Sequence, residues 1–257
     1  MSVMTAAAPR RLGAVLWGTR GLRELLLLGS LYVAYSATRV FAADDLTAAR
    51  GRARHIEAIE ASLHLDVESW LNRGTTSIGW LAVPMDYWYC ALHYLVTPVV
   101  IGWLYVRRRN SYATARNAIV IASALGLVGY LTLPTAPPRL MGGSYVDTLA
   151  RYANFGWWSG HASAPAGLGG LTNELAAMPS LHVGWAVWVA WAIWRNSDSR
   201  ARLLVPLYPL GTALVVVCTG NHWVLDAIVG LLVTTAGICV AGAIDRRRTT
   251  PTGRDLR

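Results

Sequence analysis

Long apolar runs alternate along the chain with short segments that carry most of its charged residues. A transmembrane helix needs about 20 consecutive, mostly apolar residues, and six runs reach or approach that length. They lie at residues 22–42, 80–106, 117–133, 179–194, 203–219 and 222–244. The pattern predicts an all-α integral membrane protein, a bundle of six helices. The third and fourth runs are short, so we expect their helices to stand nearly upright or to have buried ends.

Composition supports this prediction and bounds the domain organisation. Of the 257 residues, 54% are hydrophobic and 14% are charged, whereas soluble chains carry about 25% charged residues. The length leaves no room for a second large domain. We therefore expect a cytoplasmic N-terminus (1–21), a first transmembrane helix with an extracytoplasmic amphipathic segment (22–79), a membrane core (80–245) and a cytoplasmic tail (246–257).

The arginines predict how the bundle is oriented. The formal net charge is +9, which would suggest a nucleic acid partner if it were clustered in a soluble fold. Instead, sixteen of the 23 basic residues, all of them Arg, lie before the first run, between the second and third, between the fourth and fifth, or after the sixth. The positive-inside rule makes that side cytoplasmic. We therefore predict a multi-pass protein of the cell membrane with both termini inside and no nucleic acid partner.

Two longer segments then face the outside. In residues 44–79, Ile56, Ile59 and Leu63 recur at helical spacing among charged residues, which predicts an amphipathic helix on the membrane surface or over the bundle. A solvated connecting helix is the alternative. The segment 135–177 is rich in Gly and Ala, and connections of this length are usually functional or disordered.

Polar side chains suited to a phosphoryl group stand at the outer ends of three apolar runs. Ser180 and His182 lie in AAMPSLHVGWA, His222 and Asp226 lie in TGNHWVLDAIVG, and Arg139 lies in PTAPPR. In the first motif a proline falls at the expected helix start, where it is favoured, and a helix N-terminus attracts anions. The predicted orientation brings all three motifs to the extracytoplasmic side, where we expect the active site.

These residues suffice for phosphoryl transfer. On a helix, His222 and Asp226 would share a face, and the carboxylate would fix the imidazole tautomer and leave one nitrogen free as nucleophile. The positive end of the sixth helix would keep His222 neutral. His182 could protonate the leaving oxygen, Arg139 could bind phosphoryl oxygens in bidentate fashion, and Ser180 could both cap its helix and contact phosphate.

Other residues leave alternatives open. Two histidines and an aspartate could also hold zinc, but no fourth ligand or water-activating acid is evident, and we predict no metal and no cofactor. His93 lies within the second run, where an ionisable residue suggests a function, although a hydrogen bond inside the bundle would also account for it. His93, His161 and Asn173 are candidates for contacts with a headgroup or an acceptor.

The three motifs, in this order and spacing, resemble those of the type 2 phosphatidic acid phosphatase superfamily. TNELAAMPSLH resembles most closely the branch that contains inositol phosphorylceramide synthases. The resemblance covers residues 80–244 and implies a six-helix core with metal-independent catalysis through a phosphohistidine on His222. It implies that Asp226 orients this residue, that His182 acts first as acid and then as base, and that Arg139 binds the phosphate.

The chain departs from the superfamily pattern at two cationic positions. Thr132 stands where the first motif usually has Lys, and Val215 and Val216 stand where the third usually has Ser-Arg. The synthase-like branch tolerates such losses, and Arg151 is a candidate for a replacement cation.

The sequence therefore predicts a membrane lipid phosphatase or phosphotransferase that acts on a lipid phosphate or a phospholipid headgroup at the outer leaflet. Its partners would be the membrane lipid substrate and either water or a polyol such as inositol as the acceptor. A polyprenyl diphosphate phosphatase is an alternative enzyme. A non-catalytic lipid-binding or transport protein is the alternative outside enzymology, although the grouping of the motifs on one side counts against it.

Overall fold

The computed structural model describes residues 19–41, 45–159, 162–165 and 173–249, and most of them are helical. The α-helices are α2 (Thr19–Phe41), α3 (Leu46–Ser62), α4 (Glu68–Thr76), α5 (Gly79–Tyr87), α6 (His93–Arg107), α7 (Arg109–Thr132), α8 (Thr148–Arg151), α9 (Leu181–Asn196), α10 (Leu207–Cys218) and α11 (Val224–Thr249). Shorter helical turns are η1 (Trp88–Leu92), η2 (Pro138–Leu140), η3 (Ala153–Phe155) and η5 (Arg200–Leu204). The all-α prediction is confirmed, with one small addition: β1 (Trp158–Ser159) and β2 (Ala162–Pro165) form an antiparallel ribbon.

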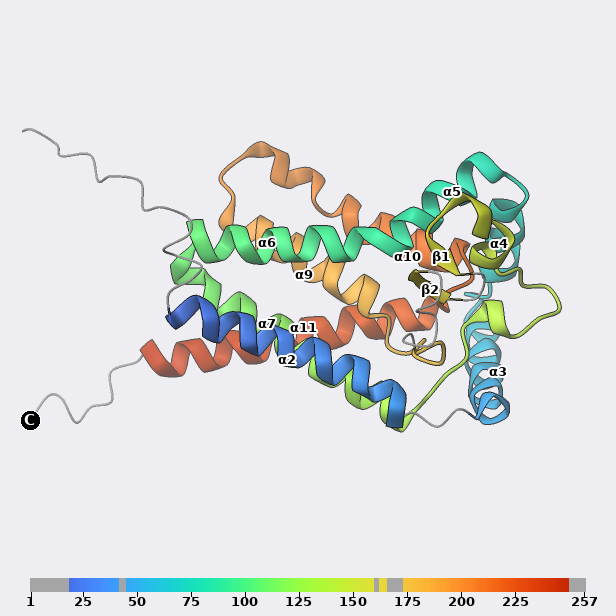
Figure 1. The fold of residues 1–257 in the computed structure, drawn as a ribbon, viewed down its shortest axis with the longest axis horizontal. Helices are drawn as coiled ribbons and strands as arrows, with labels where there is room; N and C mark the ends of the chain where they lie inside the picture. The colour runs from blue at the N-terminus through green and yellow to red at the C-terminus, as the bar shows by residue number, and fades with distance from the viewer. Residues whose placement is uncertain (1–18, 42–44, 160–161, 166–172, 250–257) are drawn as a thin grey trace, which may run out of the picture.

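The long helices run along the long axis of the molecule, and the short helices and the ribbon gather at one end (Figure 1). Helix α11 packs chiefly against α7 and α9, and α6 packs against α9 and α7. The core between these four helices is apolar and includes Leu104, Ile119, Trp188 and Val189. The indole of Trp188 donates a hydrogen bond of 2.8 Å to the Ala115 carbonyl, so its one polar atom is satisfied within the core.

Four helical stretches of the described chain are long and apolar enough to cross a membrane. They are Gly79–Arg107, Arg109–Thr132, Arg200–Cys218 and Val224–Arg248. These stretches mark the chain as a membrane protein. Helices α2 and α9 are not among them, and α9 has only 16 residues. The count of six spans therefore stays a prediction.

Three of the predicted runs differ in detail from their helices. The third run was expected to be short, but α7 has 24 residues, because its polar first turns continue the helix and Arg116 pairs there with Glu24 of α2. The second run contains the π-helical turn η1 between α5 and α6. The fifth begins as a 3-10 turn, and α10 itself has 12 residues.

Helices α3 and α4 form a cap at the end of the bundle, and α3 crosses that end (Figure 1). The buried face of α3 agrees with the predicted one only at Ile56, which is 7% exposed: Ile59 and Leu63 are about half exposed. The other buried positions of α3 are Ala49, Ala53 and Glu60. Small alanines allow close packing, and Glu60 hydrogen-bonds to α11. That this cap is extracytoplasmic stays a prediction.

Helices α9 and α11 approach each other through their backbones. A Cβ atom at Gly230 of α11 would overlap the carbonyl oxygen of Ser180, which caps α9. Beside it, the backbone N–H of Ser180 donates to the Asp226 carbonyl at 2.9 Å. Small residues at such crossings let membrane helices pack closely. The start of α9 is therefore held against the first turns of α11 with no side chain between them.

We expect Gly230→Ala to destabilise the protein by about 2 kcal/mol or more, because the two helices must separate to admit the methyl group. The measurement is thermal unfolding of the purified protein in detergent. Gly242→Ala on the same helix is the matched control, since a Cβ there meets only the flexible end of Arg246 at 3.6 Å. Equal melting temperatures for the two variants would contradict the prediction.

Candidate active site

His222 lies in a tight turn between α10 and α11. Gly220 adopts a φ of +69°, and a Cβ at this position would lie 3.1 Å from the amide nitrogen of Asn72 and 3.3 Å from the Val146 carbonyl. The turn is closed by a hydrogen bond of 3.0 Å from the His222 N–H to the Val216 carbonyl. His222 therefore precedes α11 rather than opening it, which corrects the prediction that His222 and Asp226 share a helix face.

Asp226 still lies beside His222, because its side chain turns back from the first turn of α11. One carboxylate oxygen accepts a hydrogen bond of 2.9 Å from the Trp223 N–H, the arrangement by which an acidic residue caps a helix start. The same oxygen is 3.4 Å from Nδ1 of His222. His222 is 3% exposed and Asp226 is fully buried, so this pair is shielded from water.

The surroundings of His222 assign its tautomer. Nδ1 is 2.9 Å from the Ala177 carbonyl oxygen, which can only accept, and the Asp226 carboxylate on the same side also favours a donor. The proton of the neutral ring therefore belongs on Nδ1. Nε2 is buried and has no hydrogen-bond partner among the described residues, which leaves its lone pair available.

His182 lies in the first turn of α9 and close to His222. The ring centroids are 5.6 Å apart, and Tyr89 of the π turn stacks on His182 at 4.4 Å. Ser180 is the N-cap of α9, and its hydroxyl accepts from the Val183 N–H at 3.5 Å, so its predicted role as a cap is confirmed. The sequence suggested that Pro179 is the first helical residue, but it precedes the cap, and α9 begins at Leu181.

Arg139 is attached to the turn that carries His222. Its backbone N–H donates to the Gly220 carbonyl at 2.8 Å, and its side chain is 5% exposed. The guanidinium lies 3.1 Å from Asp147 and 3.9 Å from Glu174. The three motifs therefore meet, as predicted, but Arg139 is paired with carboxylates in this state. A phosphate would have to compete with them.

The other candidate residues are distributed differently. His93 opens α6, and its ring lies 4.3 Å from that of His182. His93, His182 and His222 therefore form a group of three neighbouring rings, the histidine cluster. The side chain of Asn173 accepts a hydrogen bond of 3.1 Å from the Leu175 N–H, which is a local contact within its own turn. His161 falls outside the described residues. Arg151 is exposed and lies over the ring of Tyr152 at 6.0 Å.

Sequence reasoning missed two buried glutamates at the start of α11. Glu68 accepts from the Val224 N–H at 2.9 Å and Glu60 accepts from the Leu225 N–H at 2.7 Å. With Asp226 on the N–H of Trp223, three carboxyl groups cover three consecutive backbone donors. The positive end of this helix is thus occupied by acids, which corrects the expectation that its dipole acts on His222. The signal was that Glu60 falls on the buried alanine face of α3.

The pKa of Glu60 lies far from its ordinary value in these surroundings. Burial, together with the neighbouring Glu68 and Asp226, raises the pKa of Glu60 from 4.5 to about 9, against the opposing hydrogen bond from Leu225. Glu60 is therefore protonated at neutral pH.

We expect the stability of the folded protein to fall as pH rises from about 4.5 to 9. Over that window the unfolded chain has released the Glu60 proton and the folded chain still holds it, so rising pH favours unfolding. Glu60→Gln keeps an oxygen for the Leu225 N–H and removes the titration, which should flatten the profile. The melting temperature across this range tests it, with Asp66→Asn as the control for an exposed carboxylate. An unchanged slope in Glu60→Gln would rule out this assignment.

No group of three or more His, Cys, Asp or Glu side chains in the described part of the chain is arranged to hold a metal ion. The residues gathered here instead provide an imidazole with a free nitrogen, a second imidazole beside it and a buried arginine. Such a set can supply a nucleophile, a proton donor and a cation for an anionic group.

Comparison with known proteins agrees with this chemistry. Searches of curated proteins and of solved structures gave no match. The profile of the PAP2 superfamily matches residues 54–240, a range that contains Glu60, Glu68 and every residue of the histidine cluster. That range covers well over half of the sequence, and membership indicates a phosphatase or phosphotransferase. The chain belongs to the PAP2 superfamily of type 2 phosphatidic acid phosphatases.

Proposed function

We propose that the protein is an integral membrane lipid phosphatase or phosphotransferase that works through a phosphohistidine on His222. The observation that supports this most is the state of that ring: Nδ1 is held by the Ala177 carbonyl and Asp226, and the buried Nε2 has no partner among the described residues. A nitrogen held in this way has its lone pair ready for phosphorus.

The reaction proceeds in two displacements. Nε2 of His222 attacks phosphorus and the bond to the leaving oxygen breaks, while His182 donates a proton to that oxygen. Water or an alcohol then attacks the phosphohistidine, His182 takes the proton of the attacking hydroxyl, and the nitrogen–phosphorus bond breaks. Arg139 binds the phosphoryl oxygens once they replace Asp147 and Glu174 as partners of its guanidinium. Ser180 lies at the start of α9, as does His182.

We further propose headgroup transfer, as in the inositol phosphorylceramide synthase-like branch. Val215 and Val216, which replace a usual Ser-Arg pair, are buried in the core, so no cation reaches the phosphate from that position. Thr132 stands in place of a usual lysine, and its hydroxyl donates a hydrogen bond of 2.8 Å to the Val128 carbonyl of its own helix. A site with fewer cations suits a phosphodiester, which carries less charge than a monoester.

The membrane placement follows from the arginines. We place α2 and α9 among six spans, the histidine cluster on the extracytoplasmic side and both termini in the cytoplasm. The substrate then enters from the outer leaflet with its acyl chains in lipid. His93, beside His182, is positioned to contact the headgroup or the acceptor hydroxyl.

The test uses purified protein in lipid nanodiscs with a panel of lipid monophosphates, lipid diphosphates and phospholipids, with and without inositol, followed by phosphorus NMR. Headgroup transfer that requires the added alcohol supports a synthase. Free phosphate without an acceptor supports a phosphatase, and preference for a polyprenyl diphosphate supports that alternative. No turnover of any substrate, together with lipid binding or transport, would contradict the enzymatic proposal.

A further inference from the structure

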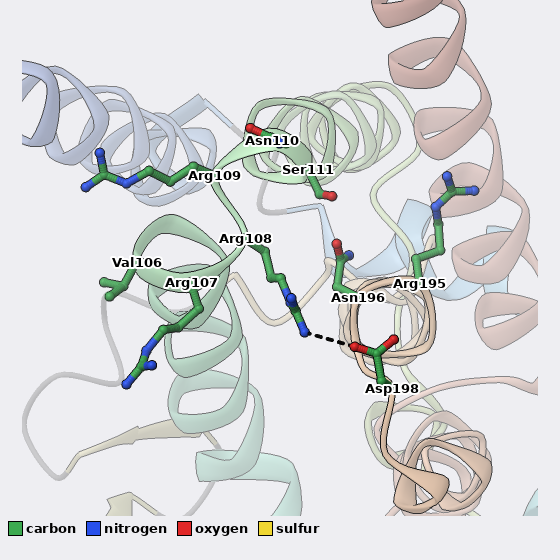
Figure 2. Close-up of a pocket in the computed structure, with 9 residues that line it drawn as sticks. All are labelled: Val106, Arg107, Arg108, Arg109, Asn110, Ser111, Arg195, Asn196 and Asp198. Atoms are coloured by element: carbon green, nitrogen blue, oxygen red, sulfur yellow. Dashed lines mark hydrogen bonds and ion pairs between the residues drawn. The ribbon is translucent and has the colours of Figure 1, made fainter. Parts of the chain in front are cut away.

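A polar cavity lies at the end of the bundle opposite the histidine cluster. It measures about 520 Å³ and is formed where α6 ends, α7 begins and α9 ends. His182 and Arg195 lie at opposite ends of α9, about 20 Å apart at the rise of an α-helix. Figure 2 shows Arg108 reaching across the cavity toward Asp198, with Ser111 and Asn196 beside it.

The charge of the cavity is strongly positive. Four arginines and one carboxylate line it: Arg107, Arg108, Arg109, Arg195 and Asp198. Arg108 and Asp198 are 3.5 Å apart, and the Asp198 side chain is 97% exposed, so this pair is weak and easily displaced. In the described chain, none of the other three arginines forms an ion pair within 4 Å. The cavity therefore lacks the anions needed to balance it.

Backbone geometry adds to the same charge. Helix α7 has 24 residues and begins at Arg109, so its unsatisfied N–H groups and the positive end of its dipole face this region. The hydroxyl of Ser111 and the amides of Asn110 and Asn196 supply further hydrogen-bonding groups at the lining.

The cavity lies at the boundary of the membrane-spanning region. One candidate span ends at Arg107 and the next begins at Arg109. An adjoining cavity of about 450 Å³ is lined by Trp103, Arg107 and Arg108, and tryptophan beside arginine is typical of the interface between headgroups and acyl chains. The positive-inside rule explains why arginines occur at this end, but it does not require them to line a cavity.

We propose that this cavity, the arginine pocket, binds the phosphate-bearing headgroup of an anionic phospholipid in the leaflet opposite the histidine cluster. Basic pockets between membrane helices recognise such headgroups. The phosphate lies beside Arg108 near the start of α7, with Arg195 at the margin of the site, and the acyl chains extend past Trp103. This site is separate from the catalytic cluster and does not depend on the reaction assigned to it.

The test measures lipid binding by native mass spectrometry of protein from nanodiscs of phosphatidylcholine with a minor fraction of phosphatidylglycerol. The double variant Arg108→Gln/Arg195→Gln should lose retained phosphatidylglycerol, with an apparent affinity reduced about tenfold or more. Arg247→Gln/Arg248→Gln is the matched control, since it removes the same charge at the same end of the bundle from residues outside the lining. Equal losses in both variants would mean general attraction to the surface and would overturn the proposal.

Two further measurements distinguish a lipid site from misfolding and from a site for soluble anions. Asp198→Asn removes the competing carboxylate and should increase phosphatidylglycerol retention severalfold, a gain that misfolding cannot produce. Unchanged or lower retention would count against the site. Inorganic phosphate added to the protein should compete only weakly with the lipid. Displacement of the lipid by phosphate at equal concentration would show a site for soluble anions instead.

Discussion

Replacing His222 with alanine is expected to lower turnover by at least about 1,000-fold while leaving the fold intact. The variant loses the only nitrogen in the proposed mechanism that bonds to phosphorus, and enzymes that lose their nucleophile fall nearly to the level set by binding alone. Loss of the ring removes the polar contacts of Nδ1 with the Ala177 carbonyl and the Asp226 carboxylate, and Asp226 keeps its hydrogen bond from the Trp223 N–H, so the effect on stability should be small compared with the effect on rate. Phosphorus NMR assays measure the effect on turnover, and thermal unfolding of the same preparation measures the effect on stability.

The decisive control is a histidine elsewhere in the molecule. His55 of α3 is exposed, and His55→Ala should keep wild-type turnover. Rapid quenching with labelled substrate should trap acid-labile phosphate on the wild type and on His55→Ala but not on His222→Ala. Labelling that persists in His222→Ala would place the covalent intermediate on another residue and refute the assignment.

Asp226→Asn is expected to lower turnover by about 1,000-fold with little change in affinity for the lipid. The carboxylate serves two donors, the Trp223 N–H and Nδ1 of His222, and it favours the tautomer with the proton on Nδ1. An amide offers one oxygen for both and can turn its NH₂ toward the ring, which favours the wrong tautomer. In catalytic triads the same change has a comparable effect.

A merely structural role for Asp226 would leave the tautomer unchanged, so the readout is nitrogen NMR of His222 alongside the kinetics. In the wild type the nitrogen chemical shifts should report a protonated Nδ1 and an unprotonated Nε2, and in Asp226→Asn they should report the reverse. Asp245→Asn, the same substitution in the last turns of α11, should alter neither the shifts nor turnover. Full activity in Asp226→Asn would show that the Ala177 carbonyl alone orients the ring.

The candidate site motifs could be found from sequence because each is local and stands at the end of an apolar run. The pattern located His182, His222, Asp226 and Arg139 at one level of the bundle, and the structure brings them together. The helix bounds were less predictable, since polar turns such as the start of α7 continue a helix beyond its apolar stretch.

The groups around these motifs could not be predicted, because they depend on contacts far apart in the chain. Glu60 and Glu68 are separated by more than 150 residues from the N–H groups that they accept from. Tyr89, which stacks on His182, lies in the π turn η1, and no residue pattern in the sequence predicted that turn. The conformation of the His222 turn depends on Gly220 fitting against Asn72, a residue of α4.

The backbone contact between Gly230 and Ser180 has a consequence for how such a protein can diversify. Because main-chain atoms fix the separation of α9 and α11, substitutions of core side chains elsewhere should leave this separation unchanged. Among the described residues of the segment from Thr135 to Ala177, none contributes atoms to that contact, but Arg139 holds the His222 turn and Ala177 holds the His222 ring. Changes of length or composition between these two residues can alter which lipid or acceptor is admitted without moving α9 relative to α11. New specificities should therefore be reached by exchanging the interior of this connection while Arg139 and Ala177 are kept.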